Sequence, residues 1–201
     1  MARHCVLTAF AVLALAAVAS GPAEALDVMP WKAGGRCAGI VLSGEIRRSE
    51  ATDAIRRIDA AAARCVTRIL VIGKMPGGSV NDAVAIGAAI RAKGYVTAAV
   101  PLSQCYSACG LVFLGGTQRY WHEQALFVIH RPRIYETFKD VATEIAAYED
   151  LRGRLSRYVS GMGANADYVD AMYDVAPQDT RPVNPAQMTA WGLFTTVGQP
   201  F

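Results

Sequence analysis

Val66 to Gly73 constrains the fold more than any other stretch of the sequence, because it is nearly all apolar. A strand of this composition is typical of a parallel sheet that is covered on both faces. Helical patterns flank it over Ser49 to Arg64 and Val80 to Lys93, and further apolar runs occupy Ala38 to Ser43 and Tyr95 to Val100. This alternation predicts an α/β fold with a parallel β-sheet and right-handed crossovers.

The remainder of the chain is predicted to form shorter elements and one long helix. Leu26 to Gly35 reads as a loop because it contains Pro30 and a Gly-Gly pair. Short strands are expected at Arg119 to Trp121 and Ala125 to Ile129, before a long helical pattern over Glu136 to Val159. A short helix and a last strand are expected at Asn184 to Trp191 and Gly192 to Val197.

One face of the predicted 136–159 helix is apolar. Its apolar residues recur at helical spacing and are Phe138, Val141, Ile145, Tyr148, Leu155 and Val159. Charged residues such as Lys139 and Asp150 cover the other face. A stripe of this length is more typical of a packed or oligomer-contact face than of a functional site. We therefore expect the chain to form a homo-oligomer through this helix.

Three turns that carry chemically useful residues follow predicted strands. Met75 to Val80 contains a Pro-Gly-Gly turn whose N–H groups can approach a ligand, because glycine has no Cβ. Gln104 to Gly110 places Ser107 among small residues, and Phe127 to Pro132 places His130 at the end of an apolar run. A serine hydroxyl becomes reactive when a base removes its proton and N–H donors receive the developing oxyanion. The three turns therefore predict a nucleophilic serine at the carboxyl ends of the strands, where such sheets bind ligands.

These turns, taken in order, resemble the proteolytic subunit of the Clp protease, within the wider crotonase-like superfamily. The matching segments are Pro76-Gly77-Gly78, Ser107 and Ile129-His130-Arg131-Pro132. The likeness extends over roughly residues 36 to 197. It implies a fold of repeated ββα and βαβ units flanked by helices. It also implies a projecting helix, at the 136–159 pattern, through which subunits join into rings.

The resemblance also assigns roles to individual residues. It implies that Ser107 is the nucleophile, that His130 is the general base, and that the N–H groups of Gly78 and Ala108 form the oxyanion hole. Such a site attacks an acyl carbonyl through a covalent acyl-enzyme.

The aspartate of the triad is expected near the end of the chain. The segment Pro177 to Pro182 is similar to the family segment whose aspartate orients the catalytic histidine. Asp179 is therefore the expected third member of the triad. The interval is about one residue longer than in the family, so Asp174 remains an alternative.

The sequence thus predicts a serine hydrolase, most simply a peptidase that acts on a peptide or protein. Two alternatives stay open. One is a catalytically silent domain of this fold that serves as an oligomeric binding or scaffold module, since cysteines flank Ser107 where the family has small residues. The other is a thioesterase-like acyl hydrolase. No metal or nucleotide cofactor is implied, and no ATPase partner is expected outside the cytoplasm.

Residues 1 to 25 read as a secretory signal peptide. Arg3 precedes an apolar segment from about Val6 to Ala19, and Ala23-Glu24-Ala25 is a small-x-small cleavage site. The apolar segment is shorter than the about 20 residues that span a membrane. The protein is therefore expected in the periplasm or secreted, as a single domain over residues 26–201, and membrane attachment is expected only if the signal segment stays uncleaved. The net charge of +3 is scattered, which argues against nucleic acid as a partner.

Cysteine usage agrees with export. Removal of the signal leaves four cysteines, an even number in an oxidising compartment: Cys37, Cys65, Cys105 and Cys109. Among three connectivities, the favoured pairs are Cys37 with Cys65, which open neighbouring apolar runs, and Cys105 with Cys109. The spacing of the cysteines matches no common zinc site.

Overall fold

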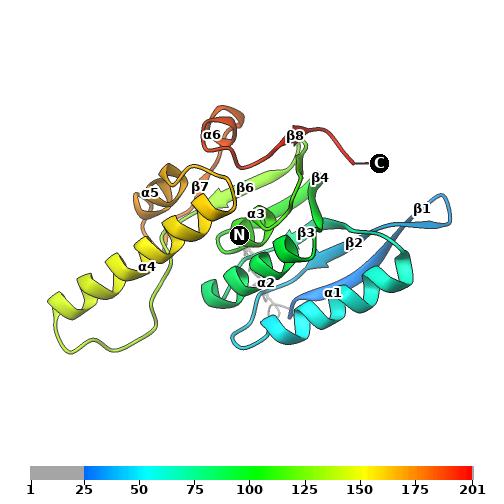
Figure 1. The fold of residues 1–201 in the computed structure, drawn as a ribbon. Coiled ribbons are helices and arrows are strands. Elements are labelled where there is room, and N and C mark those ends of the chain that lie inside the picture. Colours follow the sequence, from blue (N-terminus) through cyan, green and yellow to red (C-terminus); the bar gives the residue numbers. More distant parts are fainter. Residues whose placement is uncertain (1–24, 201) are drawn as a thin grey trace, which may run out of the picture.

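The sheet that the sequence predicts forms the centre of the computed structural model, which describes residues 25–200 (Figure 1). The strands are β1 (Asp27–Ala33), β2 (Arg36–Ser43), β3 (Ile69–Met75), β4 (Val96–Tyr106), β5 (Arg119–Trp121), β6 (Leu126–Ile129), β7 (Arg181–Pro182) and β8 (Thr196–Val197). The helices are α1 (Ala51–Cys65), α2 (Val80–Ala92), α3 (Cys109–Leu114), α4 (Val141–Gly161), α5 (Asp167–Tyr173) and α6 (Pro185–Ala190). The predicted signal segment, up to residue 24, lies outside the described residues.

The sheet is largely parallel, as predicted. Its order is β1-β2-β3-β4-β5-β8, and β6 pairs with the second half of β4 and with β7. Strands β2 to β6 run parallel along these pairings, while β1 and β7 add antiparallel strands at the margins. Each parallel step needs a crossover, which α1 supplies between β2 and β3 and α2 supplies between β3 and β4. The mixed α/β class and the βαβ repetition expected from the sequence are therefore confirmed.

The predicted loop at Leu26 to Gly35 is wrong, because Asp27–Ala33 forms the edge strand β1. Pro30 pairs opposite Ile40 of β2 in the antiparallel register. Proline has no N–H to donate, but an edge strand leaves one side outside the ladder, so Pro30 is compatible with this position. The Gly34-Gly35 pair, both at positive φ, then turns the chain into β2.

Helices α1, α2 and α3 lie side by side against the sheet and enclose the core (Figure 1). The central strands and the two long helices contribute fully buried aliphatic side chains: Ile40, Leu42, Leu70, Ile72, Ile58, Ile86 and Ile90. Each such burial stabilises the fold by about 1.5–3 kcal/mol. The apolar run that defines β3 is thus the middle of the core, which explains why it lacks polar alternation.

Strand β4 extends beyond its predicted end, and helix α3 follows it after a short turn. β4 continues beyond Val100 to Tyr106, through Pro101, with an irregularity in its pairing to β3. Helix α3 begins only at Cys109, after the Ser107 turn. The reason is Ser107, whose φ of +56° cannot occur inside a right-handed helix.

Helix α4 begins after an Asp140 cap, whose carboxylate accepts from the Thr143 N–H at 2.8 Å. Its second half packs on the body through the buried Leu151, Leu155 and Val159. Its first half projects from the body, and Ile145 there is 54% exposed (Figure 1). No helix within residues 25–200 has the length and apolarity that a membrane crossing needs.

Both predicted disulfides are present. Cys37 of β2 is bonded to Cys65 at the end of α1, and Cys105 of β4 is bonded to Cys109 at the start of α3. The Cα–Cα separation is 5.3 Å in each. The cysteines of the first pair are half-buried and lie 28 positions apart in the sequence. Those of the second pair are buried and lie 4 positions apart.

Candidate active site

Ser107 lies in a sharp turn at the carboxyl end of β4. Its φ of +56° is uncommon for a residue other than glycine. The Ser107 N–H donates to the carbonyl of Val128 in β6 at 2.8 Å, and the Gly110 N–H donates to the Ser107 carbonyl at 3.1 Å. These two bonds fix the left-handed turn from both sides. Such a strained position, between a strand and a helix, is typical of functional residues.

The glycine turn at the end of β3 contacts the Ser107 turn directly. Gly77 and Gly78 have φ values of +98° and +127°. A Cβ on Gly77 would lie 2.7 Å from the Tyr106 carbonyl oxygen and 2.9 Å from the Ser107 Cβ. Only glycine fits at this contact, so the two turns lie together as the strand order predicts.

Ile46, in the segment between β2 and α1, fixes the glycine turn from its other side. The Ile46 N–H donates to the Gly77 carbonyl at 2.7 Å, and the Ser79 N–H donates to the Ile46 carbonyl at 2.7 Å. This isolated parallel bridge uses the backbone groups on either side of Gly78. The Gly78 N–H therefore stands outside the ladder, as an oxyanion donor must.

A cavity of about 950 Å³ brings Ser107, Gly78 and His130 together. The Ile46–Ser49 segment, the start of α2 and the 132–136 segment form its walls, and Leu151 and Arg154 of α4 line one side. Arg154 pairs with Asp150 at 2.9 Å. The cavity thus combines apolar surface with charged groups, as ligand-binding sites commonly do.

His130 follows β6 and is half-buried. Its Nδ1 lies 3.0 Å from the Arg131 carbonyl oxygen. A carbonyl only accepts, so Nδ1 carries the proton of a neutral ring and Nε2 is left as the basic nitrogen. Within residues 25–200, no hydrogen bond joins His130 to the Ser107 hydroxyl or to a carboxylate.

The predicted aspartates are not brought to His130 by a hydrogen bond in the described chain. Asp179 and Asp174 are both exposed, and the Asp179 N–H donates to the Ala176 carbonyl at 3.0 Å. The segment that carries them is tied to the histidine strand, because the Arg131 N–H donates to the Val175 carbonyl at 2.9 Å. The choice between Asp179 and Asp174 therefore stays a prediction.

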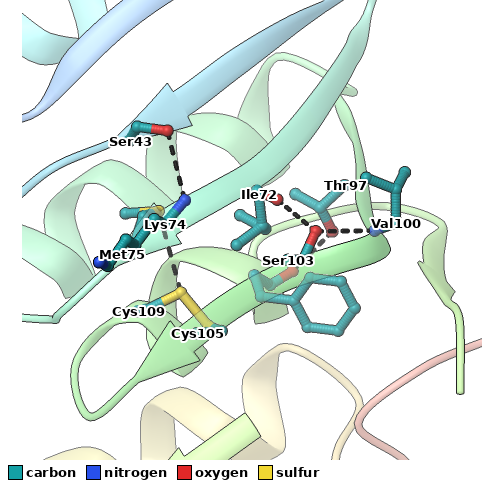
Figure 2. Close-up of a disulfide and its surroundings, with 10 residues drawn as sticks. Ser43, Ile72, Lys74, Met75, Thr97, Val100, Ser103, Cys105 and Cys109 are labelled. Carbon is teal, nitrogen blue, oxygen red and sulfur yellow. Dashed lines mark hydrogen bonds between the residues drawn. A yellow bond between two sulfur atoms is a disulfide. The ribbon is translucent and has the colours of Figure 1, made fainter. Parts of the chain in front are cut away.

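The Cys105–Cys109 disulfide closes the base of the Ser107 turn. Figure 2 shows it beside Met75 of β3, with 3.8 Å between the Cys109 and Met75 sulfurs. Both cysteines are at most 1% exposed. The disulfide therefore belongs to the core under Ser107, and a dissolved reductant has no direct access to it.

Sequence reasoning missed the residues that support the glycine turn. These are Ile46, whose partners Gly77 and Ser79 lie 31 and 33 positions away, and Asp82, whose partners Ser49 and Ala51 lie 33 and 31 positions away. A helix-start signal in Ser79 was the one local clue, because its hydroxyl caps α2 by accepting from the Asp82 N–H at 3.4 Å.

The described residues contain no cluster of three or more His, Cys, Asp or Glu side chains with the arrangement of a metal site.

The fold and the arrangement of its turns define a protein of the Clp protease class. A family model described as Clp protease matches residues 33–194 of the chain. The chain therefore belongs to the Clp protease family.

Among solved structures, the chain is similar to a mutant of ClpP1 from Listeria monocytogenes. The two share 15% sequence identity, with a TM-score of 0.58, over 80% of this chain and 91% of that chain. At this identity the likeness demonstrates the fold. No curated protein matches the sequence.

Proposed function

We propose that the protein is an exported serine peptidase with Ser107 as its nucleophile. The observation that carries the proposal is the contact between the Ser107 turn and the glycine turn, beside a cavity that His130 also lines. Ser107 and Gly77, both at positive φ, contact each other, and strained backbone positions of this kind gather at functional sites. They are the geometry that directs a hydroxyl and backbone N–H groups at one point.

In the proposed reaction, the Ser107 Oγ attacks the carbonyl carbon of a peptide bond while His130 Nε2 takes its proton. The carbonyl oxygen becomes an oxyanion, which the Gly78 and Ala108 N–H groups bind. Collapse breaks the carbon–nitrogen bond, and the imidazolium returns the proton to the leaving amine. Water then hydrolyses the acyl-enzyme by the same proton route.

The tautomer that this reaction needs is already favoured by the Arg131 carbonyl, which accepts from His130 Nδ1. We propose Asp179 as the group that takes over this role and stabilises the imidazolium, with Asp174 as the alternative. Either carboxylate would add a full negative charge, which a carbonyl lacks.

We also propose that the protein acts as a homo-oligomer joined through the first half of α4. Val141 and Ile145, two residues of its apolar stripe, are 70% and 54% exposed. Exposed apolar residues in register on a projecting helix are typical of an association surface. Burial of this half against a second subunit would account for its apolar residues.

Export to the periplasm or medium is proposed from the signal-like N-terminus and from the two disulfides. Disulfides persist in oxidising compartments and are rare in the cytosol of mesophiles. No ATPase partner is proposed, because such a motor needs cytoplasmic nucleotide.

A catalytically silent scaffold is the second candidate function. It is favoured by the missing hydrogen bond between Ser107 and His130 within residues 25–200, and by the exposure of Asp179. Catalytic hydrogen bonds are often long without substrate, so this geometry is also compatible with a peptidase.

Hydrolysis of a fluorogenic peptide library by the oxidised mature chain tests the peptidase proposal. We expect turnover that Ser107→Ala abolishes and Ser160→Ala, an exposed serine on α4, leaves intact. An acyl thioester assayed in parallel identifies a thioesterase if it alone is hydrolysed. If Ser107→Ala keeps both activities, the nucleophile assignment is contradicted. If the parent protein hydrolyses neither substrate, the scaffold is favoured.

A further inference from the structure

Asp82 is a buried carboxylate that no step of the proposed reaction uses. It lies in the first turn of α2 and is 8% exposed. One carboxylate oxygen accepts from the Ala51 N–H at 3.0 Å, and the other accepts from the Ser49 N–H at 3.1 Å and from the Ser79 hydroxyl. Asp82 thus satisfies backbone groups of a segment more than 30 residues earlier.

These bonds make Asp82 the cap of a helix other than its own. Ala51 is the first residue of α1, and Glu50 at the cap position makes no side-chain capping bond. The Glu50 carboxylate instead accepts from the Arg47 N–H and pairs with Arg57. The start of α1 is therefore held by a charge on α2, where its N-terminal dipole favours an anion.

The segment that leads into α1 is fixed at two points. At one end, Ile46 makes both backbone bonds to the glycine turn, through Gly77 and Ser79. At the other end, Ser49 has a φ of +62° and donates its N–H to Asp82. Ser79 connects the two points, because its N–H donates to the Ile46 carbonyl and its hydroxyl donates to the Asp82 carboxylate.

We propose that Asp82 is a positioning residue for the oxyanion turn. Its carboxylate holds Ser49 and the start of α1, this holds Ile46, and Ile46 sets the direction of the Gly78 N–H. The proposal rests on the proposed function of the same site. It concerns residues that the Ser–His–Asp assignment does not include.

The charge of Asp82 is central to this role. Burial opposes ionisation, but the Ser79 hydroxyl and the N–H groups of Ala51 and Ser49 outweigh it and keep the pKa of Asp82 below its usual range. An uncharged amide at this position offers one acceptor in place of two. It would leave the N–H of Ser49 or of Ala51 without its partner, and the left-handed Ser49 would lose the bond that holds it.

Asp82→Asn tests the proposal, with Asp53→Asn as the matched control. Asp53 lies in the first turn of α1, as Asp82 does in α2, but it is exposed, and its ion pairs within residues 25–200 are with Arg56 and Arg57. We would titrate both variants with a fluorophosphonate probe and measure the rate at saturating probe and the number of sites labelled. If Asp82 has a positioning role, Asp82→Asn should be labelled at one site per chain, at about a tenth of the parent rate or below. Asp53→Asn should be labelled at the parent rate.

A purely structural role of Asp82 gives a different result. The labelled fraction would then fall while the folded fraction reacts at the parent rate, and this outcome would overturn the proposal. If Asp82→Asn does not fold, Ser79→Ala and Ser79→Thr replace it. Threonine keeps the hydroxyl that bonds Asp82, so Ser79→Thr is expected to label faster than Ser79→Ala, and equal rates would contradict the proposal.

Amide hydrogen exchange separates this proposal from the proposed function. The Ile46 and Ser79 N–H groups are expected to exchange at least about tenfold faster in Asp82→Asn than in the parent or Asp53→Asn. Equal exchange in all three proteins would refute the coupling, whether or not the parent reacts with the probe. A parent that is never labelled but shows the exchange difference would refute the peptidase and leave the coupling in place.

Discussion

The Ser107 side of the candidate site is held far more tightly than the His130 side. Ser107 and the glycine turn are fixed by backbone hydrogen bonds from β6, α3 and Ile46, and by the contact of Gly77 with the Ser107 turn. His130 stands at the end of a strand, followed by residues 131–140 without helix or strand. Its ring makes one hydrogen bond, to the adjacent Arg131 carbonyl.

This difference indicates how the two sides would contribute to the proposed catalysis. The oxyanion donors must be placed before the reaction, because their benefit depends on needing no reorganisation. A general base can reach its working position when substrate binds, since apo geometry often tightens in the complex. We therefore expect changes on the Ser107 side to act through position, and changes on the His130 side to act through proton transfer.

Gly77→Ala is expected to have the largest effect. The added Cβ would meet the Tyr106 carbonyl and the Ser107 Cβ, and the residue would keep a φ of +98° that alanine disfavours. Displacement of the nucleophile turn should lower the probe-labelling rate by about a hundredfold or more. Gly94→Ala is the control, because it also changes a glycine at positive φ but has no atom within 4 Å of the new Cβ. Similar rates for both variants would show that the contact does not position Ser107.

Asp179→Asn is expected to have a smaller effect. The Arg131 carbonyl still favours the correct tautomer of His130, so only the charge that stabilises the imidazolium is lost. We expect the labelling rate to fall by about tenfold, measured across pH 6–9 so that the plateau rates of the variant and the parent are compared. Asp174→Asn is the matched comparison, and a larger loss in that variant would move the assignment to Asp174.

Joint replacement of Cys105 and Cys109 by alanine should change the labelling rate modestly. The disulfide closes the turn beneath Ser107, but the Val128 and Gly110 hydrogen bonds remain. A change of about threefold or more is expected, since the turn gains freedom around the nucleophile. A labelling rate equal to that of the parent would show that the disulfide serves the core alone.

Cys37→Ala with Cys65→Ala should leave the labelling rate unchanged and act on stability. This bond joins β2 to α1 at the end of the strands away from the glycine turn. Its loss is expected to lower the free energy of unfolding by about 2–4 kcal/mol. Chemical denaturation of the oxidised proteins measures this free energy. A fully folded double variant that is labelled more slowly than the parent would contradict the separate roles of the two disulfides.

The sequence predicts the Ser107 side well because its signals are local. The apolar run of β3, the Gly77-Gly78 pair and the serine after β4 each lie within a few residues of the structure that they specify. The edge strand β1 was missed because Pro30 is a loop signal unless the pairing partner is known. Asp82 gave no signal of its role, since its partners Ser49 and Ala51 lie over 30 residues away. The choice of the proposed third triad member, Asp179 or Asp174, depends in the same way on the position of an exposed segment.

The central claim is that Ser107 is an activated nucleophile, and mass spectrometry of the mature, oxidised protein tests it most directly. After incubation with a fluorophosphonate, we expect one adduct per chain, located on Ser107 by peptide mapping. Ser160→Ala should give the same adduct, and Ser107→Ala should give none. An unmodified parent protein, or an adduct on another residue that persists in Ser107→Ala, would contradict the account.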